Sequence, residues 1–146
     1  MAKWTRSEQR EQAFAIVFEQ IFNSAPVDEL IENAVEARDL EVSDYARETA
    51  KKTAAHLDEI DAEIERYSRT WRKNRICKAV LAILRLALCE MKYCDDVPVS
   101  VAINEAVELA KKYATLEDAQ FVNGLLGTVA REQGLDTAED AASETL

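Results

Sequence analysis

The side chains that most often do chemistry are sparse in this sequence. His56 is the only histidine, and no serine or cysteine lies at a motif spacing that would pair it with a nucleophile. The cysteines, Cys77, Cys89 and Cys94, are odd in number and form no CxxC pair, which favours neither a zinc site nor a disulfide framework. Reduced thiols suit the cytoplasm. We therefore predict no catalytic residue, no metal site and no cofactor.

Basic side chains are the second group that could do chemistry, because arginine and lysine bind phosphate groups. The stretch RYSRTWRKNRICK, residues 66–78, holds six basic side chains, two aromatic rings and no acid. Lys3, Arg6 and Arg10 form a second group at the start of the chain, where Arg6 and Arg10 are four residues apart and share one helical face. Each group could bind nucleic acid, or could be a solvated helix face with packed aliphatic stems.

The overall charge limits how these basic residues are used. The chain of 146 residues has a formal net charge of -10 and a sequence pI of about 4.6. A field of this sign repels phosphate, which argues against indiscriminate nucleic-acid binding but not against a local basic face. The start MAKWTRSEQREQ lacks the apolar core of a signal peptide. The longest apolar run, residues 79–84, is far shorter than the ~20 residues of a membrane span, so we expect a cytoplasmic protein.

The elements that must position these residues are helices. Glycine and proline are too rare for a turn-rich β protein, and Ala, Leu, Glu, Lys and Arg dominate. Thr5 and Glu8 fit a capping box before an apolar stripe over residues 6–22. Further stripes follow Pro26, begin at Ser43 with a break near His56, cover residues 76–93 and 100–113, and follow a second capping box at Thr115. The sequence therefore predicts an all-α compact bundle of about seven helices.

Two of these segments carry more specific expectations. Residues 76–93 are apolar on nearly every side, which is typical of a buried central helix, with Cys77 and Cys89 packed as small apolar residues. Gly124 and Gly127 lie inside the last helix and favour a close approach to another backbone. We place one domain at residues 1–134, followed by an acidic tail, residues 135–146, whose composition is typical of disorder.

Several segments together resemble one known family. REQAFAIVFEQ (residues 10–20), AILRLALCEMKY (82–93), DVPVSVAINEAVELAKKYA (96–114) and FVNGLLGTVA (121–130) resemble, in order and spacing, the NusB family of bacterial transcription antitermination factors. The resemblance covers nearly the whole chain except the acidic tail. It implies seven helices in two sub-bundles. It also implies binding of the boxA element of nascent ribosomal RNA, together with the small-subunit ribosomal protein NusE, in the RNA polymerase antitermination complex.

The resemblance also points to particular residues. The family's RNA surface combines the arginine-rich start of the first helix with the start of the last, which here implies Arg6, Arg10, Gln120 and Phe121, with Lys3 added on charge alone. An aromatic ring gives a platform for an unstacked base, and arginines grip phosphates. Phe18 occupies a family aromatic position and could be either core or surface.

The sequence departs from the family pattern at several positions. Ser7, Glu8 and Gln9 replace basic residues that often precede the family's Arg-Glu pair, and Val80 and Leu81 replace an acid and a base. These changes predict weaker phosphate contacts, and they are compatible either with greater dependence on NusE or with a homodimer that covers an apolar surface. They leave open an alternative, a helical protein-interaction module or homodimer with weak intrinsic RNA binding. We expect a secondary basic patch in the 66–78 stretch to contact RNA or NusE, formed by Arg72, Lys73, Arg75 and Lys78.

Overall fold

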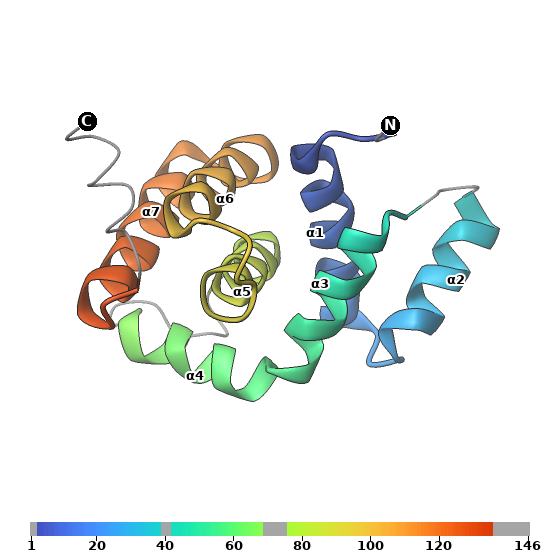
Figure 1. Ribbon diagram of the computed structural model, residues 1–146, viewed down its shortest axis with the longest axis horizontal. Coiled ribbons are helices and arrows are strands. Elements are labelled where there is room, and N and C mark those ends of the chain that lie inside the picture. The colour runs from blue at the N-terminus through green and yellow to red at the C-terminus, as the bar shows by residue number, and fades with distance from the viewer. Residues whose placement is uncertain (1–2, 39–41, 69–75, 136–146) are drawn as a thin grey trace.

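The computed structural model describes residues 3–38, 42–68 and 76–135, and every regular element within these ranges is an α-helix (Figure 1). The helices are α1 (Arg6–Phe22), α2 (Val27–Arg38), α3 (Asp44–Ala55), α4 (Leu57–Tyr67), α5 (Lys78–Tyr93), α6 (Val99–Tyr113) and α7 (Leu116–Glu132). The predicted all-α fold is confirmed. Helices α1 to α3 pack against one another, α4 to α7 form a second group, and α5 contacts both groups.

Side-chain caps fix the start of the two helices that carry most of the predicted RNA-binding residues. The Thr5 hydroxyl accepts from the N–H of Glu8 at 3.0 Å, and the Glu8 carboxylate accepts from the N–H of Thr5 at 2.8 Å. Thr115 and Asp118 form the same capping box at the start of α7. Each box satisfies N–H groups that a helix start leaves unpaired, so both predicted helix starts are confirmed.

The predicted break between the third and fourth helices falls on His56. Helix α3 ends one residue before it and α4 begins one residue after it. The imidazole stacks on the ring of Tyr93 in α5, with ring centroids 3.8 Å apart, and its Nδ1 lies 3.1 Å from the Glu59 carboxylate. The single histidine therefore packs at a helix junction.

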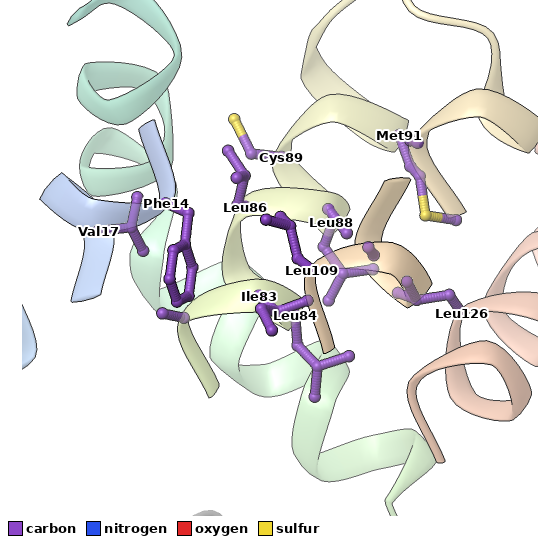
Figure 2. Close-up of a cluster of buried hydrophobic side chains, with 14 of the residues drawn as sticks. Phe14, Val17, Ile83, Leu84, Leu86, Leu88, Cys89, Met91, Leu109 and Leu126 are labelled. Carbon is purple, nitrogen blue, oxygen red and sulfur yellow. The ribbon is translucent and has the colours of Figure 1, made fainter. Parts of the chain in front are cut away.

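Helix α5 is the buried centre of the molecule, as predicted. Every residue from Val80 to Met91 is buried. Figure 2 shows the leucines of α5 between Phe14 of α1 on one side and Leu126 of α7 on the other. The helix begins at Lys78, two residues later than predicted. Cys77 stands at the N-cap, before the first turn, and is exposed, so the prediction that it packs in the core is wrong, whereas Cys89 is buried.

The two glycines of α7 have a different setting from the one predicted. A Cβ built on Gly124 would meet nothing within 4 Å, and one on Gly127 would meet only the Arg131 side chain at 3.2 Å. The end of a flexible arginine can move away from such a contact. The prediction that these glycines mark a close backbone approach is therefore wrong.

Val80 and Leu81 do not form an exposed apolar surface that a homodimer could cover. Their exposed fractions are 1% and 3%, and both belong to the core cluster. The chain buries these side chains against its own helices. This observation removes the sequence-based reason for expecting a dimer at this position.

The folded part of the chain extends slightly past the predicted domain end. The N–H of Leu135 donates to the carbonyl of Ala130 at 3.0 Å, and its side chain packs against the core. The rest of the predicted acidic tail, residues 136–146, lies outside the described residues.

Candidate nucleic-acid interface

The first turn of α1 presents a predicted RNA-binding arginine to solvent. The Arg6 side chain is 48% exposed, and its guanidinium lies over the ring of Tyr45, 3.9 Å from the centroid. One guanidinium nitrogen is 4.0 Å from the Asp96 carboxylate. Stacking covers the flat face of a guanidinium and leaves N–H groups at its edge for an anion. Lys3 is also exposed, with its ammonium 5.2 Å from the centre of the Trp4 ring.

Arg10 points into the bundle instead. It is only 4% exposed, and its Nε donates to both carboxylate oxygens of Glu90, at 3.0 and 2.8 Å. The Glu105 carboxylate is 3.7 Å away. Arg6 and Arg10 do share a face, since both approach the Tyr45 ring, but Arg10 lies one turn deeper. RNA contact by Arg10 stays a prediction, and its enclosure by acids favours a supporting role.

Glu90 joins this buried network to Tyr45. It is 1% exposed, and burial raises the pKa of its carboxyl, against the opposing effects of the Tyr45 hydroxyl and of Arg10. The Tyr45 hydroxyl donates to Glu90. Burial and the neighbouring carboxylate raise the pKa of Tyr45 far above its ordinary value, so the phenol remains a protonated donor at neutral pH. Sequence reasoning missed this network because Glu90 is 80 residues from Arg10.

The predicted residues of the last helix lie near the start of α7. Gln120 is exposed, whereas Phe121 is half-buried and packs against the core. Figure 1 shows α6 between α7 and α1. Helix α6 packs along α7 and reaches α1 through a 2.8 Å hydrogen bond from Ser7 to Glu105 and a 2.7 Å ion pair between Lys112 and Glu11. The two halves of the predicted surface are thus linked through α6.

An aromatic row continues the surface along α1. Phe14, Phe18 and Phe22 follow at four-residue spacing, with successive ring centroids 6.0 and 5.2 Å apart, and Tyr113 of α6 lies 5.0 Å from Phe14. These rings border a groove of about 480 Å³, here called the aromatic groove, whose lining is Glu11, Phe14, Ala15, Phe18, Glu19, Phe22, Ala79 and Tyr113. Phe18 meets both expectations, because it is half-buried against the core and also lines the groove. Phe22 (64% exposed) and Tyr113 (45%) were missed, although the spacing on α1 was visible in the sequence.

Charged side chains border the aromatic groove. The Lys112 ammonium lies 5.4 Å from the centre of the Tyr113 ring, and both residues bond to the Glu11 carboxylate. Burial alone would raise the pKa of Glu11, but its hydrogen bonds from Lys112 and Tyr113 lower it, so this acid is ionised and paired at neutral pH. Lys78, an exposed member of the predicted secondary patch, directly precedes the groove residue Ala79.

The remaining members of the secondary patch, Arg72, Lys73 and Arg75, lie outside the described residues. Within the described ranges, no group of three His, Cys, Asp or Glu side chains is placed to hold a metal ion. In the same ranges, no helix has the length and apolar character needed to cross a membrane. The exposed guanidinium, the ammonium groups and the aromatic groove together can bind phosphates and stack bases.

Comparison with known proteins identifies relatives over most of the chain. The model of the NusB family matches residues 7–131. The transcription antitermination protein NusB of Thermoanaerobacter sp. (strain X514) is 42% identical over 135 residues, covering 92% of this chain and 96% of the relative. The protein of the same name from Listeria monocytogenes serotype 4b (strain CLIP80459) is 39% identical over 127 residues, covering 87% and 97%.

Solved structures share the fold. The NusB protein of T. maritima superimposes with a TM-score of 0.76 and 31% identity, covering 90% of this chain and 94% of its own. A chain from the crystal structure of the antitermination factors NusB and NusE in complex with dsRNA gives 0.76 at 25% identity, covering 87% and 96%. The family match, the identities over nearly full length and the common arrangement of helices agree, and the chain belongs to the NusB family.

Proposed function

We propose that this protein is a transcription antitermination factor that binds the boxA element of nascent ribosomal RNA together with NusE. It acts in the cytoplasm within the RNA polymerase antitermination complex, where it suppresses premature termination and assists ribosomal RNA maturation. One observation carries the proposal: the chain shares its fold, over 96% of the relative's length, with a protein solved in complex with NusE and RNA.

We assign the RNA contacts to Lys3, Arg6, Gln120, Phe121 and the aromatic groove. Arg6 offers N–H groups at the exposed edge of its guanidinium, a geometry that suits a phosphate. Exposed rings in the groove offer stacking platforms, each worth about 1–3 kcal/mol per base. Arg10, held inside the bundle by Glu90, supports the first turn of α1. Lys78, which is exposed and precedes the groove residue Ala79, is assigned to the secondary contacts with RNA or NusE.

The acidic balance of the chain makes NusE important to this function. With a net charge of -10, the summed field of the protein opposes RNA at long range, so affinity rests on local contacts. NusE would add contacts and orient the RNA on the same surface. We therefore expect weak binding by the protein alone and much tighter binding in the presence of NusE.

Fluorescence anisotropy with a labelled single-stranded boxA RNA, with and without NusE and at two salt concentrations, tests the proposal. Arg6→Gln should weaken binding and lower the salt slope by roughly one unit, as expected for one lost phosphate contact. Phe22→Ala should weaken it by about 1–3 kcal/mol if a base stacks on that ring. Arg131→Gln, a charge-matched change at the exposed far end of α7, is the control. Equal binding by the parent and both test variants would refute the assigned surface.

A protein-interaction module with little RNA affinity is the competing function, favoured by apolar side chains left in solvent. Phe22 is 64% exposed and Leu116 is 69% exposed. Light scattering over a concentration series measures self-association directly. A stable dimer that Phe22→Ala converts to monomer, with boxA binding no tighter than to a scrambled RNA, would support this alternative.

A further inference from the structure

A series of three side-chain contacts connects the protein interior to the exposed guanidinium of Arg6. Arg10 holds Glu90, Glu90 accepts from the Tyr45 hydroxyl, and the Tyr45 ring carries Arg6 at 3.9 Å. The residues come from α1, α3 and α5, so three helices meet at this point. The position of Arg6 is thereby connected to groups that have almost no freedom to move.

The inner contacts of this series are rigid because Glu90 and Arg10 are buried and paired with each other. Glu90 and Arg10 are 1% and 4% exposed, and the carboxylate accepts two bonds from the same Nε. Turning the Tyr45 ring away would leave a buried carboxylate without one of its donors, which is costly. The Asp96 carboxylate, 4.0 Å from Arg6, belongs to an exposed ion pair and is a much looser tether.

We propose that Tyr45 is a positioning residue for RNA binding, whose fixed ring holds the Arg6 guanidinium flat so that its N–H edge faces an incoming phosphate. A free arginine side chain must give up many rotamers to bind, and a ring that already restrains it removes part of that loss. Tyr45 makes no contact with RNA in this scheme. The inference rests on the proposed function, because it requires that Arg6 contacts RNA.

A double-mutant cycle on boxA RNA with NusE present tests the inference. Tyr45→Leu should weaken binding about twofold to fivefold, the range expected for an exposed cation–π contact. In an Arg6→Gln background the same change should have no further effect, because the side chain it positions is absent. Tyr45→Phe keeps the ring but removes the hydroxyl that Glu90 holds, so it should recover only part of the affinity lost in the leucine variant. Ile64→Val, a mild change in the buried core of α4, controls for loss of stability.

Side-chain NMR of the protein without RNA reports on the stack itself. The Arg6 δ and ε protons should show upfield ring-current shifts in the parent, smaller ones in Tyr45→Phe, whose ring lacks the hydroxyl anchor, and none in Tyr45→Leu. If Arg6→Gln binds RNA like the parent, the proposed role of Arg6 fails, and this inference fails with it. If Arg6→Gln weakens binding but Tyr45→Leu does not, or weakens it equally in both backgrounds, only the positioning role is overturned.

Discussion

Replacing Glu90 by leucine tests how far the buried ion pair stabilises the fold. Glu90 and Arg10 are nearly inaccessible, and their two contacts measure 3.0 and 2.8 Å. Without Glu90, the Arg10 guanidinium keeps, among the described residues, the Glu105 carboxylate at 3.7 Å and the Tyr45 ring at 5.9 Å, and the Tyr45 hydroxyl loses the Glu90 acceptor. Removing one partner of a buried pair costs about 3–5 kcal/mol. This is a large fraction of the ~5–15 kcal/mol by which a typical domain is stable.

Urea unfolding followed by far-UV circular dichroism measures this cost. With an m-value of about 1–3 kcal/mol/M, a loss of ~3 kcal/mol lowers the unfolding midpoint by at least about 1 M. Glu108→Leu is the matched control, because the Glu108 carboxylate is 57% exposed and pairs with Lys111 at 3.3 Å on the surface of α6. Such a pair contributes only about 0–1 kcal/mol.

The double variant Arg10→Met with Glu90→Leu separates an unpaired charge from lost packing. Replacing both members of a buried pair by apolar side chains of similar volume is often neutral or stabilising. The double variant should therefore be more stable than Glu90→Leu alone. A single-variant cost below about 1 kcal/mol would refute the reasoning that the pair is desolvated. If the double variant is no more stable than Glu90→Leu alone, the lost stability comes from packing and not from an unpaired charge.

Three further perturbations test other parts of the fold. Leu84→Ala, at a fully buried position of α5, should cost about 2–5 kcal/mol in urea unfolding. Thr115→Ala should lower stability by about 0.5–2 kcal/mol in thermal unfolding, and Thr115→Ser should restore it, because the hydroxyl caps α7. Burial alone would raise the pKa of Glu63, but hydrogen bonds from Lys92 and Gln133 hold it below the ordinary 4.5. Its contribution to stability is therefore present above pH 4.5 and is lost as the pH falls further, so Glu63→Gln should flatten the acid limb of the stability–pH curve.

The helices could be predicted from the sequence because their signals are local. Thr5 and Thr115 each indicate a helix start, because each is followed three residues later by its capping partner. The continuous apolar character of α5 indicates that this helix is buried. The same reasoning failed for Gly124, since a glycine inside a helix is compatible either with a close helix contact or with open solvent. Only the packing of α7 distinguishes the two.

The candidate site was harder to predict because its members are paired across the fold. Arg6 and Arg10 look equivalent in sequence, yet one is exposed and the other is enclosed by Glu90 of α5. The aromatic groove is likewise only partly predictable from the sequence, because it is formed by residues of separate helices. The rings of α1 follow one another at four-residue spacing in the sequence, but Tyr113 joins them only because the end of α6 lies beside α1 in the fold.

These pairings also explain how a strongly acidic chain can offer a surface to RNA. Three acids near that surface are paired with groups of the protein itself: Glu90 with Arg10 and Tyr45, Glu11 with Lys112 and Tyr113, and Asp96 with Arg6. At physiological salt, charges farther away than about 8 Å are largely screened. The remaining acidic residues therefore slow the approach of RNA more than they weaken the contacts of RNA that is already bound. The potential that a bound phosphate meets is therefore set by Arg6 and its immediate neighbours. On this reasoning the net charge of the chain reduces the rate of encounter with RNA, while the affinity depends on how rigidly a few side chains are held.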